Sequence, residues 1–326
     1  MPDPGFPKPH APPSFPIAGT VASPASIENT GTSPRTEIAV VGVGAVGGCI
    51  AAHLSAAGKA VLLCVRHSID ALVVDTPSGV LRENPPSATD PREVQPMPWV
   101  LLATKAHQTP DAAAWLRALA GGESTIAVLQ NGVEHEARVA PYAGRAVVLP
   151  VVVECPSTRT APGRVTQNGP ARLKVPAGER GEAFARLFAG SDVEVEVVER
   201  FEDARWRKLC QNVAGGAVSA LTGRTLGVTR EPGVAWLARE LVLECVRVAR
   251  AEGVPLDDGI ADEIVTSLQE GDPGAGTSML SDRLAGASLE VDARNGAVVR
   301  LGMRHDIPTP LNRAVTAVLL AVNGDR

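Results

Sequence analysis

The chain has 326 residues, 44% of them hydrophobic and 21% charged, with a formal net charge of -5. These values are typical of a globular protein that buries a sizeable core, and they exclude a chain that is disordered throughout. The acidic balance, with no block of Lys and Arg interleaved with aromatic residues, argues against a nucleic-acid-binding protein. The length favours two domains with separate cores.

The apolar segments and the cysteines indicate in which cellular compartment the protein works. The longest apolar stretches, such as residues 314–322, are far shorter than the roughly 20 residues that a membrane-spanning helix needs. The N-terminus has no basic region followed by an apolar segment, so we expect no secretory signal. The cysteines are scattered and lack CxxC spacing, which favours free thiols in a reducing compartment. We therefore expect a soluble, cytoplasmic protein that binds neither membranes nor nucleic acid.

Residues 1–35 are rich in proline among Ser, Thr, Ala and Gly. This composition favours an extended, solvated chain, so we predict a disordered tail. A proline-rich ligand for a partner protein is the alternative, although no repeated recognition spacing stands out.

The segment 36–204 has the pattern of alternating strands and helices. Residues 37–41 are a short apolar run that leads into glycine-rich sequence, and an Ala-rich helical pattern follows as far as Gly58. Helix-compatible segments such as 111–120 separate further apolar runs, at 60–64, 99–103, 125–129 and 146–153. This order predicts an α/β fold with a parallel sheet, and the glycine-rich sequence after its first strand makes it a Rossmann-type dinucleotide-binding domain.

From about residue 165 the pattern changes, and it becomes helical after residue 204. Residues 172–175 and 193–197 alternate in polarity, which is typical of antiparallel or edge strands. Helical patterns follow at 206–221, 234–252, 281–303 and 311–322. We therefore predict a mainly helical C-terminal domain over residues 205–326.

Residues 42–47 read Gly-Val-Gly-Ala-Val-Gly, a GxGxxG sequence after a strand and at the start of a helix. Gly42 permits the tight turn, Gly44 lets the backbone approach a pyrophosphate, and Gly47 allows close packing of helix and strand. The helix N-terminus then faces the negative charge of the phosphates. We expect a dinucleotide to bind along this turn, at Gly42, Val43, Gly44, Ala45, Val46 and Gly47.

The second predicted strand ends at Arg66, where an NAD-selective site usually carries Asp or Glu for the ribose 2'-hydroxyl. An arginine can instead pair with a 2'-phosphate, so the sequence favours NADP as the cofactor. The alternative is an ordinary solvated arginine. No spacing of the histidines suggests a metal site, and we assign no metal.

Two lysines are candidates for the reaction site. Lys208 and Asn212 are four residues apart, so a helix presents both on one face, where they could grip one substrate. By spacing alone, an ordinary exposed helix face is an equally good interpretation. Lys105 directly follows the apolar run 99–103, and open α/β sheets place ligands at the carboxyl ends of their strands. A functional role is therefore favoured for Lys105.

Several separated motifs together are specific, although each alone is weak. They are the 42–47 turn, the strand end at Arg66, Thr104-Lys-Ala106, Gln130-Asn-Gly132, Trp206-Arg-Lys-Leu209 with Asn212, Thr277-Ser-Met-Leu-Ser-Asp282, and Glu290-Val-Asp-Ala-Arg-Asn-Gly296. With them, residues 36–322 resemble the ketopantoate reductase (2-dehydropantoate 2-reductase) family. The resemblance implies NADPH-dependent reduction of ketopantoate, a small 2-oxo acid, to pantoate in pantothenate biosynthesis.

The resemblance also assigns roles to residues. Lys208 would be the catalytic lysine and general acid, since an ammonium can stabilise and protonate the oxygen on which charge develops. Glu290 would be its carboxylate partner, orienting the substrate hydroxyl or the cofactor ribose and helping to keep Lys208 charged. The remaining positions implied for the cleft of substrate and nicotinamide are Asn212, Ser278, Thr277, Asn131 and Lys105.

Structural interpretations compete with these roles. Glu290 could simply form a helical ion pair with Arg294, four residues further on. Thr277 and Ser278 could cap the helix that follows, because their hydroxyls accept hydrogen bonds from free backbone N–H groups.

The main departure from the family is Gly216, where the family commonly has a second asparagine. Losing an amide that reads the substrate can change selectivity strongly, so a paralogous reductase of another 2-oxo or hydroxy acid is the first alternative. A non-catalytic NADP-binding redox sensor is the second, although such a protein would need neither Lys208 nor Glu290. The apolar C-terminal helices are compatible with a homodimer.

Overall fold

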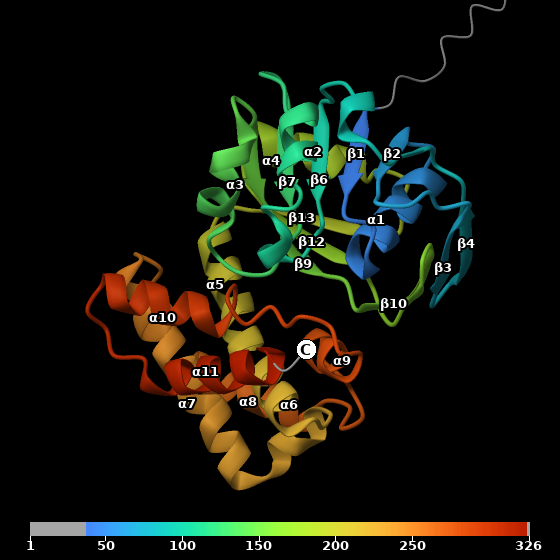
Figure 1. Cartoon of the computed structure of the whole chain (residues 1–326). Coiled ribbons are helices and arrows are strands. Elements are labelled where there is room, and N and C mark those ends of the chain that lie inside the picture. Colours follow the sequence, from blue (N-terminus) through green and yellow to red (C-terminus); the bar gives the residue numbers. More distant parts are fainter. Residues whose placement is uncertain (1–36, 325–326) are drawn as a thin grey trace, which may run out of the picture. The chain divides into compact units, whose positions relative to one another are not determined.

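The computed structural model describes residues 37–324. In it, the glycine-rich turn joins the first strand to the first helix (Figure 1). Strand β1 (Ile38–Val41) is buried along its whole length and leads through Gly42 into helix α1 (Ala45–Ala56). The strand, turn and helix predicted for this segment are therefore present. The predicted tail at 1–35 lies outside the described residues.

Strand β1 lies inside a six-stranded sheet in which every pairing is parallel. The chain passes from β1 to β2 on one side and later to β6 on the other, so the strand order reverses at β1. Open α/β sheets bind ligands at such a switch point, outside the carboxyl ends of the strands. The predicted α/β class is confirmed, with the strands in the order β5 (Ser87–Ala88), β2 (Val61–Cys64), β1, β6 (Trp99–Leu102), β7 (Thr125–Val128) and β8 (Val147–Pro150).

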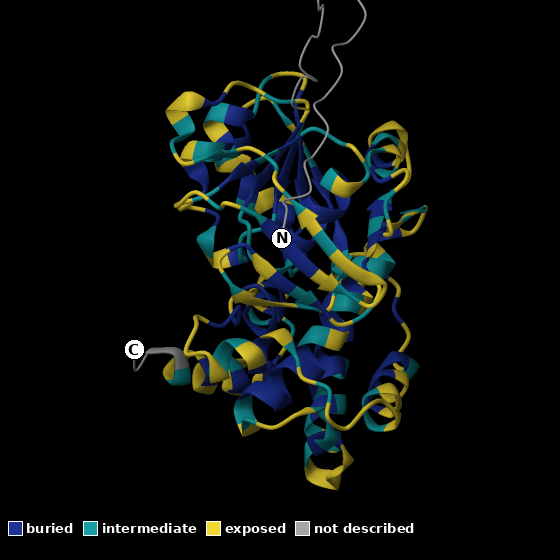
Figure 2. Ribbon diagram, turned by 90° about the vertical axis from the view of Figure 1, so that its right-hand side faces the viewer, coloured by how far each residue is buried: buried dark blue, intermediate teal, exposed yellow. Residues whose placement is uncertain are grey.

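Alternating side chains of each strand cover the two faces of this sheet. Ile38 and Val40 belong to a core that includes α1, whereas Ala39 and Val41 belong to a second core that includes residues of α2 and α3. Successive side chains of a strand face opposite sides, so a strand covered on both faces is apolar throughout. Figure 2 shows most of the sheet interior in dark blue, that is, buried. The second core includes residues of α2 (Ala113–Leu119) and α3 (His135–Ala143).

Two smaller sheets complete the α/β region. One has the order β10 (Ser157–Ala161), β11 (Arg164–Gln167), β3 (Leu72–Thr76) and β4 (Gly79–Glu83). The other has the order β13 (Glu194–Val198), β12 (Arg172–Pro176) and β9 (Val152–Glu154), and α4 (Glu179–Leu187) connects β12 to β13.

These two sheets refine the predictions for the same segments. Strand β12 pairs antiparallel with β9 and parallel with β13, and β13 lies at the edge of the sheet, so the expectation of antiparallel or edge strands is confirmed. The single run predicted at 146–153 splits into β8 and β9. The four-stranded sheet was not predicted, and its strand β4 has no buried residue from which a periodicity could be recognised.

After β13 the chain is mainly helical, as predicted, and these helices form a hydrophobic core of their own. Helix α5 packs against β9 and β12 and also against α7, so it connects the two regions. The predicted domain boundary at 204/205 falls inside α5 and stays a prediction. The helices of this region are α5 (Phe201–Gln211), a π-helical turn (Asn212–Gly216), α6 (Ala217–Thr222), α7 (Pro232–Ala251), α8 (Gly259–Glu270), α9 (Ser278–Leu284), α10 (Asn295–Arg304) and α11 (Pro310–Gly324). One short 3-10 turn lies in this region at Leu226–Arg230, and two lie in the α/β region at Pro91–Glu93 and Ala106–Gln108.

The prediction of one continuous helix over 281–303 is wrong. Helix α9 ends at Leu284, Gly286 adopts a positive φ of 69°, and α10 begins only at Asn295. The intervening loop buries the polar side chains of Glu290 and Arg294, which bind groups from other elements. These tertiary contacts override the helical pattern of the sequence.

Helix α8 is also absent from the sequence-based expectations. Its acidic residues hide an amphipathic pattern in which Ile260, Ile264 and Val265 are buried in the helical core. Between residues 37 and 324, no helix is long and apolar enough to cross a lipid bilayer.

Candidate active site

The glycine-rich turn has the geometry that a dinucleotide requires. Gly42 has a φ of +96°, and a Cβ there would lie 2.6 Å from the backbone nitrogen of Thr104. A Cβ at Gly47 would lie 2.1 Å from the carbonyl oxygen of Gly42, so both positions exclude any side chain. A Cβ at Gly44, by contrast, would meet no atom within 4 Å, which leaves open space in front of the α1 N-terminus. The turn therefore fits a pyrophosphate group.

Two basic residues follow the strands next to this turn. Arg66 is exposed just after β2, the neighbour of β1. Lys105 comes just after β6, and its ammonium pairs with Asp282 of α9 and donates to the carbonyl oxygen of Ser288 at 3.4 Å. Lys105 thus connects the sheet to the helical region in addition to lying at the carboxyl edge predicted from the sequence.

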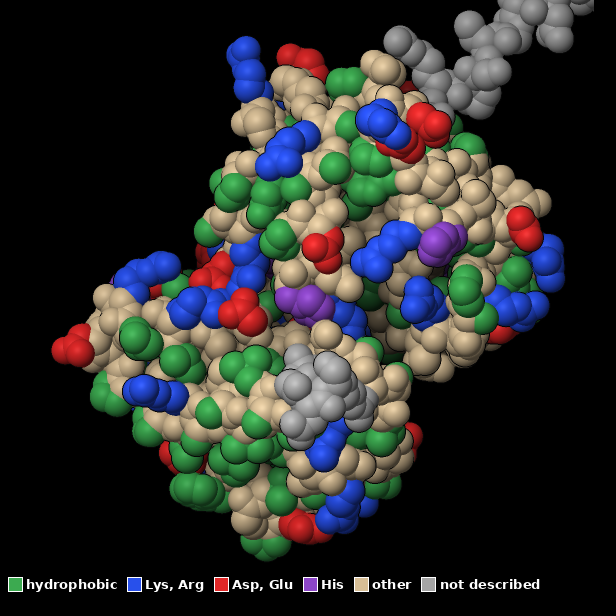
Figure 3. Space-filling view, viewed as in Figure 1, with side chains coloured by type: hydrophobic (Ala, Val, Ile, Leu, Met, Phe, Trp, Pro, Cys, Tyr) green, Lys and Arg blue, Asp and Glu red, His purple; other side chains and the backbone are tan. Residues whose placement is uncertain are grey.

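A small cavity lies where the end of β7 and the residues after β8 approach α5. Lys208 and Asn212 both line it, so the four-residue spacing does place them toward one space. Asn131 lines the same cavity from the segment after β7, and His135 does so from α3. Figure 3 shows Lys, Arg and His side chains around a hollow on the face in view.

The ammonium of Lys208 lies 4.0 Å from Glu154 Oε1, and the lysine side chain is about one quarter exposed, at 27%. Burial lowers the pKa of Lys208, while the charge of Glu154 opposes this effect. The structure thus places the carboxylate of Glu154 beside the lysine, and the role of Glu290 as the partner of Lys208 stays a prediction. No motif pointed to Glu154, because it reaches the site from the far end of β9.

Glu290 is 6% exposed and lies in the loop between α9 and α10. Its carboxylate accepts hydrogen bonds from the backbone nitrogen of Ala106 at 3.1 Å, from Asn131 Nδ2 at 2.8 Å and from Arg294 Nη2 at 3.3 Å. Burial by itself would raise the pKa of Glu290, but the charge of Arg294 and these hydrogen bonds together hold it below the usual value. The ion pair with Arg294 exists, although in a loop and not in a helix.

Hydrogen bonds connect the candidate residues across the two regions. Asn212 Nδ2 donates to Asn131 Oδ1 at 3.2 Å, and Asn131 in turn donates to Glu290. The hydroxyl of Ser278 accepts from Arg294 Nη2 at 2.9 Å. The structure therefore brings the residues of five distant motifs into one network.

Thr277 has the capping role that was the alternative interpretation. It is the N-cap residue of α9, and its hydroxyl accepts from the backbone nitrogen of Leu280 at 3.1 Å. The same hydroxyl lies 2.6 Å from that of Ser219 in α6. Thr277 thus fixes the start of α9, next to Ser278.

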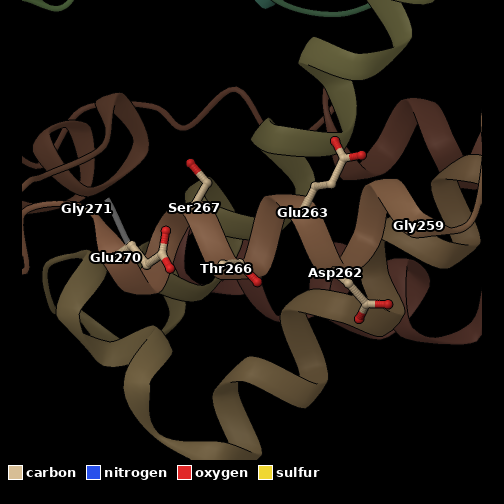
Figure 4. A pocket seen from close by; sticks show the side chains of 7 residues that line it. All are labelled: Gly259, Asp262, Glu263, Thr266, Ser267, Glu270 and Gly271. Atoms are coloured by element: carbon tan, nitrogen blue, oxygen red, sulfur yellow. The ribbon is translucent and has the colours of Figure 1, made fainter.

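A separate surface hollow lies along α8, where acidic side chains gather (Figure 4). Asp262 pairs with Arg239 at 2.7 Å, and Glu263 pairs with Arg207. These carboxylates form ion pairs at the surface, and they are not part of the hydrogen-bond network described above. Among the described residues, no group of His, Cys, Asp or Glu is arranged to hold a metal ion.

A parallel sheet with a GxGxxG turn at its switch point, together with a cavity lined by a lysine and hydrogen-bonded amides, is typical of a dinucleotide-dependent oxidoreductase. Residues 38–180 match the family model "Ketopantoate reductase PanE/ApbA", and residues 200–323 match "Ketopantoate reductase PanE/ApbA C terminal". The chain therefore belongs to the ketopantoate reductase family.

Named relatives agree with this assignment. The chain is 45% identical over 290 residues to a 2-dehydropantoate 2-reductase of Caulobacter vibrioides, an alignment that covers 88% of this chain and 99% of the relative. It is 39% identical over 299 residues to the 2-dehydropantoate 2-reductase of Mycobacterium tuberculosis, covering 88% and 98%. A solved PanE/ApbA family ketopantoate reductase from Ralstonia eutropha is 32% identical and superimposes with a TM-score of 0.82 over 89% of this chain and 99% of that one.

Proposed function

We propose that this protein reduces 2-dehydropantoate to pantoate with NADPH, a step in pantothenate synthesis. Relatives that align along nearly their full length are named for this reaction. The observation that carries the proposal is the partly buried Lys208, which shares one cavity with Asn131 and Asn212. Its lowered pKa makes its ammonium a stronger acid than an exposed lysine.

The residues that hold the dinucleotide are those of the 42–47 turn, with Arg66 on the 2'-phosphate. Gly44 gives the pyrophosphate room, and an arginine pairs with phosphate through charge-assisted hydrogen bonds. When bound, the reduced nicotinamide supplies the hydride that reaches the carbonyl carbon.

Lys208 acts on the carbonyl oxygen of the substrate. Its ammonium stabilises the negative charge that develops there and donates a proton from Nζ to the oxygen, which becomes the hydroxyl of the product. Glu154 limits the fall of the lysine pKa and so favours the acid form. Glu290 stays ionised because its pKa is lowered, and it is a fixed acceptor for a hydroxyl of the substrate or the ribose.

The deciding experiment measures NADPH oxidation by the purified protein with ketopantoate and a panel of other 2-oxo acids. We expect saturable turnover with ketopantoate and a loss of about 100- to 10,000-fold in Lys208→Ala. Turnover on another acid alone would favour the paralogous reductase, to which the glycine at position 216 points. NADPH binding without any turnover would favour the redox sensor.

The cofactor assignment has its own test. Arg66→Ala should lower kcat/KM for NADPH by about tenfold or more and leave the value for NADH unchanged, because only NADPH has the 2'-phosphate. Equal effects on both cofactors would contradict a role of Arg66 in the choice of NADP.

We also propose that the protein is a homodimer. A solved ketopantoate reductase from Staphylococcus aureus, 26% identical with a TM-score of 0.80 over 89% of this chain and 99% of that one, is described as dimeric. Light scattering on the purified chain would give the mass that decides this.

A further inference from the structure

Arg294 is a buried cation, 2% exposed, whose hydrogen-bonding capacity is only partly used. Nη2 donates to Ser278 Oγ at 2.9 Å and to Glu290 Oε2 at 3.3 Å. In the part of the chain that the structure describes, Nη1 forms no hydrogen bond and Nε is buried without a partner. Unpaired donors on a buried charge are costly, so this guanidinium has capacity for a further acceptor.

Gly216 is what allows the guanidinium to lie where it does. A Cβ at position 216 would be 3.0 Å from Arg294 Nη1 and 3.4 Å from Met279 Sδ. Gly216 ends the π-helical turn that follows α5, the helix that carries Lys208. An asparagine side chain at position 216 would compete with Arg294 for the same space, so the two residues form one unit.

Arg294 is one hydrogen-bonded group away from the cavity of Lys208. It shares Glu290 Oε2 with Asn131 Nδ2, and Asn131 lines that cavity together with Lys208 and Asn212. Burial, and to a smaller degree the nearby charge of Arg294, lower the pKa of Lys208. Lys208 and Arg294 are therefore two nearby cations, and part of the Arg294 guanidinium has no acceptor. Such a pair suits an anion that carries a carboxylate beside a carbonyl group.

We propose that Arg294 binds the carboxylate of the 2-oxo acid substrate through Nη1, while Lys208 faces the adjacent carbonyl oxygen. This inference rests on the proposed reductase function and adds to it a residue that determines specificity. The absence of a side chain at position 216 then marks a replacement of one donor by another, and not the loss of a substrate contact. The protein should select free 2-oxo acids over neutral analogues of the same shape.

The test compares ketopantoate with its primary amide, which has nearly the same shape and no charge. We expect Arg294→Met to lower kcat/KM for the acid by about 100-fold and for the amide by much less, so that the acid-to-amide ratio collapses. Arg294→Lys should retain part of the ratio, because it keeps the charge. Gly216→Ala, whose methyl group presses on Nη1, should lower the ratio by a smaller factor and leave the ion pair with Glu290 in place.

The outcomes distinguish the inference from the function on which it rests. Equal losses for acid and amide in Arg294→Met would show a purely structural arginine and overturn the inference, with the reductase function intact. Arg294→Met leaves Glu290 unpaired, which can prevent folding. In that case, an unchanged acid-to-amide ratio in Gly216→Ala overturns the inference. If the wild-type protein reduces no 2-oxo acid, the proposed function fails, and calorimetric binding of pantoate and its primary amide to the NADP-loaded protein decides the role of Arg294 by the same ratio.

Discussion

Asn131 donates a hydrogen bond from its side-chain amide to Glu290 Oε2 at 2.8 Å, although the two residues are 159 positions apart. Asn131 follows β7 of the sheet, and Glu290 lies in the loop before α10. The other end of the same amide accepts a hydrogen bond from Asn212. Asn131 therefore has a fixed orientation, and it connects the parallel sheet to the π-helical turn that follows the helix of Lys208 and to the loop that contains Glu290 and Arg294.

Replacement of Asn131 should weaken catalysis in a graded way. Asn131→Ala removes one partner of a buried carboxylate, and we expect kcat/KM for ketopantoate to fall about tenfold or more. Asn131→Asp should be worse and should also lower the melting temperature, because two carboxylates would then face each other at hydrogen-bonding distance. Steady-state kinetics and thermal unfolding would check both. The exposed Asn168→Ala is the control, and an aspartate variant as active as the wild type would contradict the network.

The alkaline limb of the pH profile should depend on Glu154. The role proposed for Lys208 needs its protonated form, so kcat/KM should fall as the pH rises through the lysine pKa, which burial places below the ordinary value of 10.5. In Glu154→Gln the opposing charge is gone, the pKa falls further, and the limb should move to lower pH. The measurement is the profile of kcat/KM for both proteins, with the exposed Glu196→Gln as control. A limb that stays in place would mean that a group other than Lys208 donates the proton.

Two glycines of the dinucleotide turn should respond oppositely to alanine. A methyl group at Gly44 meets open space, so Gly44→Ala should fold with unchanged stability but bind NADPH about tenfold or more weakly, because the methyl takes the place of the pyrophosphate. Gly42→Ala has a positive φ and a backbone clash at 2.6 Å, so it should lose stability itself. Denaturant unfolding and cofactor titration by fluorescence separate the two effects. Equal loss of stability in both variants would contradict the geometry.

His135 should make the fold sensitive to acid. Burial, with a contribution from the charge of Arg205, lowers its pKa from 6.5 to about 4. A histidine that stays neutral when folded but takes up a proton when unfolded contributes stability above pH 6.5, and this is lost as the pH falls toward 4. The loss should reach about 3 kcal/mol. Urea unfolding at neutral and acidic pH should show a smaller change in His135→Gln, whereas the exposed His107→Gln should behave as the wild type does.

Local sequence determined the part of this protein whose physics is local. The strand, glycine turn and helix at residues 37–57 and the apolar runs of the parallel sheet depend on residues within one or two turns of chain, so their pattern predicts them. The spacing of Lys208 and Asn212 likewise sets their common direction along α5 and the π-helical turn that continues it. Family motifs added the positions of Glu290, Ser278 and Asn131.

The partners of these residues were decided by the tertiary structure alone. Glu154 reaches Lys208 from another strand, Arg294 lies in a loop where the sequence predicted a helix, and Gly216 matters only because a guanidinium occupies the space beside it. Each contact joins segments that are distant along the chain, and such a contact leaves no periodicity or local spacing from which it could be predicted. The long-range packing of the helices against the sheet creates the electrostatics of the site, and that packing depends on the whole fold.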